Sequence, residues 1–180
     1  MTKIYLATDH RGFELKEKIK VWLHEWGYEY QDFGALTFKS DDDYTDFIPE
    51  VAKKVSLDPE NSKGIILGAT GQGEAMLANR YKGVRAAVFY GPPFQFKRMS
   101  WRKWLLLGDD GGAGVMGTEE LKIFMELIKL SREHNDSNVL SLGASFLGAR
   151  AAKKIIKLWL ETPFSEEERH KRRINKIDNV

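Results

Sequence analysis

Short apolar segments alternate with longer segments of helical periodicity along this chain, and this alternation is the strongest constraint on its fold. Lys3 to Thr8 is a short apolar run, and Phe13 to Trp26 then places its apolar side chains at roughly helical spacing. Similar pairs follow along the chain. Strands that alternate with helices, several of them unbroken apolar runs, are typical of a parallel sheet whose two faces are covered by helices.

The same patterns predict the remaining elements. Further strands are predicted over residues 28–33, 64–67, 84–90 and 138–142. Further helices are predicted over residues 47–55, 73–81, 118–132, 148–160 and 165–176. The result is an α/β fold with a mainly parallel five-stranded sheet. Such sheets bind ligands at the carboxyl ends of their strands, so the residues that follow each strand are the first candidates for a site.

Length and composition narrow the function classes. The chain has 180 residues, of which 42% are hydrophobic and 30% charged, as expected for a single globular domain over residues 1–180. No apolar run is long enough to span a bilayer, and a net charge of +2 is too small to indicate nucleic acid. We expect a cytoplasmic protein without membrane or nucleic-acid partners. The sequence contains no cysteine, which excludes disulfides, thiolate metal sites and a cysteine nucleophile.

Two stretches follow predicted strands directly. Asp9 and His10 come after the first strand, where they suit a polar site, although an N-cap aspartate followed by a surface histidine explains them equally well. The glycine loop, residues 68–74, comes after the third strand. Its glycines let backbone N–H groups gather at a helix N-terminus, where an anion or a developing oxyanion binds. A dinucleotide-binding loop would follow the first strand with different glycine spacing, and a plain tight turn is the other alternative.

Two further stretches carry clusters of polar residues. Arg132 to Asp136 precedes the fifth strand, and on its own it reads as a helix C-terminus with basic and turn residues. Arg169 to Arg173 follows three glutamates near the chain end, and on its own it reads as a charge-striped, solvated helix face.

Together these stretches resemble the family of type B ribose-5-phosphate isomerases and galactose-6-phosphate isomerases. The likeness runs through residues 4–90 and resumes over residues 131–177. Its marks, in chain order, are Asp9-His10 with Gly12 to Lys16, Asp43 to Asp46, the glycine loop with Ala78 to Arg80, Arg132 to Asp136, and Arg169 to Arg173. The resemblance implies a Rossmann-like three-layer α/β/α sandwich and an aldose–ketose isomerase of a small phosphorylated sugar, without metal or cofactor. It also implies a homodimer or dimer of dimers, with the active site near the subunit boundary.

The family divides by the identity of its base. One branch has a cysteine at the position of Gly68, and the other has a glutamate at the position of Glu74, so this cysteine-free chain resembles the glutamate branch. Isomerisation needs a base that moves a proton between neighbouring carbons through an enediolate, and Glu74 is the candidate. Backbone N–H groups of the glycine loop can hold the enediolate oxygen, and Thr70 can relay a proton between the oxygens. By resemblance, His134 opens the sugar ring with help from Asp9.

The resemblance also assigns the binding residues. The positions that match the phosphate contacts of the family are His10, Arg169, His170 and Arg173. The positions expected to line the substrate pocket are Tyr44, Gly71, Gln72, Gly73 and Asn135. Arginine suits a phosphate because its planar donors meet two phosphate oxygens together.

Two departures from the family pattern bear on the substrate. Ser145 stands where the family has a phosphate-contacting arginine, and an inserted segment at about residues 91–130 replaces a short connection. Arg98 or Arg102 of the insert is a candidate for the missing cation, and a surface amphipathic helix is the simpler interpretation. A basic helix at about residues 165–177 closes the chain.

Three functional readings follow. The first is the isomerase. The second is a regulatory protein that binds a sugar phosphate without turnover, which the missing arginine motivates. The third is a nucleic-acid-binding protein that uses its basic tail and whose binding weakens steeply with salt.

Overall fold

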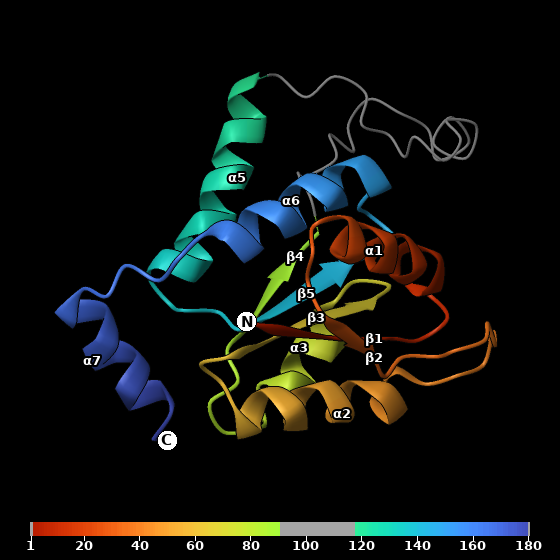
Figure 1. The fold of residues 1–180 in the computed structure, drawn as a ribbon, viewed down its shortest axis with the longest axis horizontal. Coiled ribbons are helices and arrows are strands. Elements are labelled where there is room, and N and C mark those ends of the chain that lie inside the picture. The colour runs from red at the N-terminus through yellow and green to blue at the C-terminus, as the bar shows by residue number, and fades with distance from the viewer. Residues whose placement is uncertain (1, 91–117, 180) are drawn as a thin grey trace.

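The computed structural model describes residues 2–90 and 118–179, which form a parallel sheet with helices on both faces (Figure 1). The strands are β1 (Lys3–Thr8), β2 (Tyr30–Asp32), β3 (Ser62–Gly68), β4 (Ala86–Phe89) and β5 (Val139–Gly143). The helices are α1 (Phe13–Glu25), α2 (Tyr44–Leu57), α3 (Gln72–Ala78), α5 (Thr118–Glu133), α6 (Ala149–Glu161) and α7 (Glu168–Ile177). The α/β prediction with a five-stranded sheet is confirmed, and every strand pair in the described sheet is parallel.

The strand order is β2-β1-β3-β5-β4, which places β1 and β3 side by side. The chain leaves β1 toward one edge of the sheet to form β2, and it returns to the other side of β1 to form β3. Ligands of α/β sheets bind beyond the carboxyl ends of the strands at a reversal of this kind, and we call this region at β1 and β3 the crevice. Asp9 and the glycine loop therefore meet at the carboxyl edge.

Alternate residues of the central strands pack into two separate cores, as the period of two in a strand requires. Ile4 and Leu6 of β1 belong to the core beneath α1 and α6, whereas Ala7 belongs to the core beneath α2. Figure 1 shows these helices on opposite faces of the sheet. The largest fully buried side chain is Trp159 of α6.

The predicted element boundaries differ from the structure in two places near the site. Helix α2 begins at Tyr44 rather than Phe47, because Asp43 adopts the extended backbone of an N-cap and the polar first turn carries no apolar signal. Helix α3 ends at Ala78 rather than Tyr81, with a turn after it. Among the described helices, none is long and apolar enough to cross a membrane.

Candidate active site

Asp9 lies in the crevice at the carboxyl end of β1, and its side chain is buried. Its carboxylate accepts a hydrogen bond from the backbone N–H of Arg11 at 2.9 Å. Burial raises the pKa of Asp9, although the Arg11 N–H and the neighbouring His10 act in the opposite direction. The negative charge of Asp42 adds to the raised pKa of Asp9.

Glu74, in the first turn of α3, is the second buried carboxyl group in the crevice and is only 4% exposed. Desolvation raises the pKa of Glu74, its own backbone N–H opposes that rise, and the charge of Asp9 adds to it. A Cβ atom added to Gly68 would overlap the carboxyl oxygen Oε1 of Glu74. The glutamate therefore occupies the space in which a side chain at position 68 would lie. A side chain at position 68 would therefore require the Glu74 carboxylate to move.

The glycine loop is held in place from β5. Gly71 has a φ of 74°, in the left-handed region that favours glycine, and its carbonyl accepts a 2.6 Å hydrogen bond from the buried hydroxyl of Ser141. Among the described residues, the backbone N–H groups of Gly71 and Gly73 have no hydrogen-bond acceptor. Two free N–H groups beside a buried carboxylate can bind an oxyanion.

Three further residues, Thr70, Tyr44 and Ser145, lie in or against the glycine loop. The hydroxyl of Thr70 accepts the backbone N–H of Gln72 at 3.3 Å, and the Thr70 side chain is exposed. A Cβ on Gly73 would lie 2.7 Å from the hydroxyl oxygen of Tyr44, so Tyr44 packs directly against the start of α3. The backbone N–H of Ser145 donates to the carbonyl of Ala69 at 3.1 Å. Position 145, where the sequence resemblance predicts an arginine, therefore lies beside the glycine loop.

The remaining predicted site residues lie at the opposite edge of the sheet. His134 and Asn135 precede β5, so they lie at the amino ends of the strands, and α7 lies on the same side of the molecule (Figure 1). The rings of His134 and His170 are in contact, with their centroids 4.3 Å apart and their planes tilted by 39°. A strand of five to seven residues is about 16 to 23 Å long, so one chain does not bring His134 to Glu74.

Of the predicted phosphate-binding residues on α7, only the two arginines are exposed to solvent. His170 is 1% exposed, and its Nδ1 atom is 2.7 Å from the Ser165 hydroxyl. Burial, and then the neighbouring His134, lower the pKa of His170. Arg169 and Arg173 are exposed on α7, and Arg169 pairs with Glu167 at 2.7 Å.

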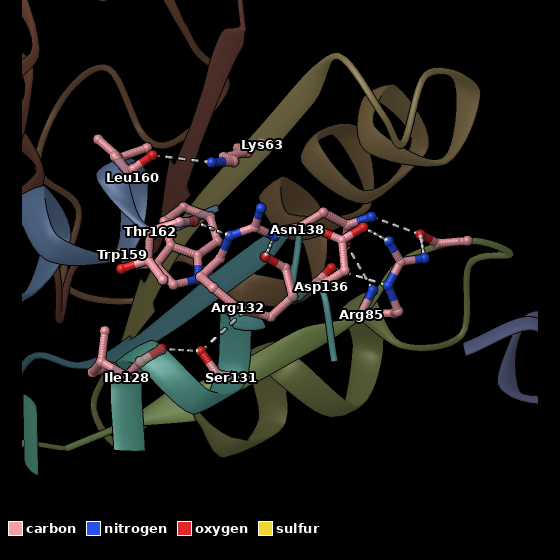
Figure 2. A network of polar contacts seen from close by, with 12 residues as sticks. Lys63, Arg85, Ile128, Ser131, Arg132, Asp136, Asn138, Trp159, Leu160 and Thr162 are labelled. Carbon is pink, nitrogen blue, oxygen red and sulfur yellow. Dashed lines mark hydrogen bonds and ion pairs between the residues drawn. The ribbon is translucent and has the colours of Figure 1, made fainter. Parts of the chain in front are cut away.

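A polar network fixes the segment that carries His134 and Asn135 (Figure 2). The Asp136 carboxylate bridges two guanidinium groups, that of Arg132 at 2.6 Å and that of Arg85 at 2.8 Å. Arg132 also donates to the carbonyl groups of Ser137 and Thr162. These contacts tie the end of α5 to β4 and to the chain after α6. His134 is thus held on a rigid turn.

The sequence patterns did not single out three residues that the structure places in these two groups: Asp42, Ser141 and Ser165. Asp42 is the middle of three consecutive aspartates, and nothing in the sequence separates it from its neighbours. Arg98 and Arg102, proposed from the sequence as replacement cations, lie outside the described residues, as does most of the insert at about 91–130.

The fold and the crevice define a Rossmann-like α/β enzyme with two buried carboxyl groups and free backbone N–H groups at its switch point. The profile of the Ribose/Galactose Isomerase family matches residues 4–94 and 124–177, and the chain belongs to that family.

Relatives and solved structures agree with this assignment. The chain is 31% identical over 173 residues to the ribose-5-phosphate isomerase B of Mycolicibacterium paratuberculosis, covering 96% of this chain and 87% of the relative. The crystal structure of ribose-5-phosphate isomerase B from Mycoplasma genitalium with bound ribulose-5-phosphate matches with a TM-score of 0.78 and 30% identity, over 99% of this chain and 95% of that one. The ribose 5-phosphate isomerase of Thermotoga maritima matches with a TM-score of 0.74 and 35% identity, over 99% of both chains.

Proposed function

We propose that this protein interconverts the aldose and ketose forms of a small phosphorylated sugar, with ribose 5-phosphate and ribulose 5-phosphate as the first candidate pair. The observation that carries the proposal is the buried Glu74 carboxylate in the space left by Gly68, beside Asp9 and the free N–H groups of the glycine loop. Family membership and relatives named ribose-5-phosphate isomerase B support the same reaction.

Glu74 is the proposed base. It removes the proton from the carbon next to the carbonyl group and returns it to the neighbouring carbon, so that no atom is gained or lost. Burial that raises the pKa of Glu74 makes its carboxylate a stronger base than an exposed one. The enediolate oxygens then accept from Gly71 and Gly73 N–H, and Thr70 moves a proton between the two oxygens.

We propose that a second copy of the chain completes the site as a homodimer or dimer of dimers. The reaction of a cyclic sugar phosphate needs a ring-opening acid or base and cations for the phosphate, and the candidates His134, Arg169 and Arg173 lie at the edge opposite Glu74. His170 is buried and its ring contacts that of His134. When the amino edge of the sheet in one copy meets the carboxyl edge in another, His134 and the arginines of α7 come close to Glu74 and the glycine loop.

Exposed apolar side chains at the carboxyl edge favour this pairing. Leu36, Phe38 and Phe146 lie on loops that follow β2 and β5, and they are 76%, 60% and 52% exposed. Large exposed apolar side chains at this edge are available to pack against a second copy of the chain. The mass of the purified protein in solution tests the pairing, and a monomeric enzyme with full activity would contradict it.

The test of the reaction is an assay of four-, five- and six-carbon aldose and ketose phosphates with the wild type and Glu74→Gln. We expect one pair to be interconverted by the wild type and a loss of kcat of about 1000-fold in Glu74→Gln with KM little changed. Binding of sugar phosphates without turnover of any of them would instead identify a regulatory binding protein.

A further inference from the structure

Asp42, on the loop between β2 and α2, binds His10 through one carboxylate oxygen. The Oδ1 atom of Asp42 accepts the backbone N–H of His10 at 2.7 Å and lies 2.8 Å from the ring atom Nδ1 of the same residue. The two side chains are 8% and 19% exposed, so the pair is largely shielded from solvent. The loop that carries Asp42 is thereby joined to the segment that follows β1.

His10 is the only hydrogen-bond partner of the Asp42 side chain among the described residues. The other oxygen, Oδ2, is buried without a partner, and the N-cap of α2 is the next residue, Asp43. A buried carboxylate oxygen with no hydrogen bond costs free energy, so the burial of Asp42 requires an explanation. Asp42 therefore has no capping or folding contact that would account for its burial apart from His10.

The other groups around His10 do not compete for its ring nitrogens. Asp9 bonds to the backbone N–H of Arg11, and the ring of Phe38 meets the His10 ring edge-on with the centroids 6.4 Å apart. An ionised carboxylate can only accept a hydrogen bond, so we assign a proton to the Nδ1 atom of His10. Nε2 is then the one ring atom left for a ligand.

We propose that Asp42 is a positioning residue that fixes the ring orientation and the Nδ1–H form of His10, so that Nε2 faces the phosphate group of the substrate. This inference rests on the proposed function, in which His10 contacts that phosphate. When Nε2–H donates to a phosphate oxygen, the ring carries both protons, and the adjacent Asp42 carboxylate balances its charge. Asp42 itself does not touch the substrate.

The pair is tested without any substrate by NMR of the histidine ring nitrogens at a pH where the rings are neutral. In the wild type we expect His10 to show a protonated Nδ1 whose proton exchanges slowly, unlike the ring of the exposed His24 on α1. In Asp42→Ala the His10 signals should become like those of His24. Wild-type His10 signals that already match those of His24 would overturn the proposal, even if no variant can be purified.

Kinetics test the consequence for binding. In Asp42→Ala we expect KM for the phosphorylated substrate to rise about 10-fold while kcat stays within about twofold, since one charge-assisted contact is lost. Asp42→Asn keeps an oxygen that can accept from Nδ1–H and should recover part of the loss, and Asp41→Ala, at an exposed neighbour, should change neither constant. If kcat falls by the same factor as KM rises, and Tm is also lower, Asp42 has a structural role only. A wild type without turnover would refute the proposed function, whereas the NMR result would still decide the His10–Asp42 pair.

Discussion

The carboxylate of Glu74 lies where the side chain of residue 68 would begin, so the smallest possible side chain at the end of β3 is a condition for the position of the proposed base. Gly68→Ala should push Glu74 out of the crevice. We expect kcat to fall by about 100-fold or more, because a displaced base loses its alignment with the reacting carbon.

A matched control separates this effect from loss of stability. Gly27→Ala places a Cβ in open space at a position with a φ of 76°, so it strains the backbone far from the crevice without displacing a side chain. This variant should lower Tm and leave kcat unchanged. A Gly68→Ala enzyme that keeps wild-type kcat would show that Glu74 does not need its present position.

The charge of Asp9 sets part of the pH dependence. A base must be ionised, so kcat/KM falls as the pH drops through the pKa of Glu74, which burial and then Asp9 raise. Asp9→Asn removes the contribution of the Asp9 charge to the pKa of Glu74. The acid limb of the plot of kcat/KM against pH should therefore move to lower pH, even though the rate also falls. The measurement is kcat/KM from about pH 4 to pH 9. Glu14→Gln, at an exposed position on α1, should leave the acid limb of the pH profile unchanged. An acid limb that is also unchanged in Asp9→Asn would show that the charge of Asp9 does not affect the pKa of Glu74.

The role proposed for His134 depends on whether the substrate forms a ring. His134→Ala should lose most activity on five-carbon sugar phosphates, which cyclise, and keep much of it on a four-carbon sugar phosphate that cannot close the same ring. The loss on the cyclic substrate should be about 100-fold, the usual contribution of a positioned acid or base. Equal losses on both substrates would refute this division of labour.

The parallel sheet and the crevice could be predicted from the sequence because both rest on short-range patterns. The run from Lys3 to Thr8 is apolar enough to mark a strand with the observed bounds, and the groups that follow two neighbouring strands must share an edge. The same rule places His134, which precedes a strand, at the other edge.

Long-range pairing could not be predicted in this way. Lys16 looks like a solvated residue of an amphipathic helix, yet it is fully buried and paired with Asp32 at the end of β2. Asp42 contacts His10 only because the loop between β2 and α2 folds back toward the carboxyl end of β1. Such contacts depend on the geometry of the whole sheet, and spacing along the chain carries no signal for them.

Lys63 makes the stability of the fold depend on pH in the alkaline range. Burial and the nearby Arg132 lower the pKa of Lys63 to about 8, from 10.5. Between these two values the unfolded chain binds a proton that the folded chain lacks, so the free energy of unfolding rises with pH in this window and is independent of this group below it. The gain should be on the order of 1 kcal/mol, since part of the shift is screened by solvent.

Chemical denaturation at about pH 7.5 and pH 10 measures this slope. The part of the rise that Lys63 contributes should be missing in Lys63→Met and present in Lys18→Met, which alters an exposed lysine on α1. The same slope in both variants would show that Lys63 does not titrate in this range.

The placement of Glu74 and His134 at opposite edges of one sheet has a genetic consequence under the proposed pairing. On a substrate that forms a ring, Glu74→Gln and His134→Ala would each lose most activity, because each lacks one half of every site. When the two are mixed and allowed to exchange subunits, each mixed dimer regains one intact site, so roughly a quarter of all sites should recover activity. Two alleles that fail alone would then complement each other in the same cell, and the enzyme would lose specific activity on dilution.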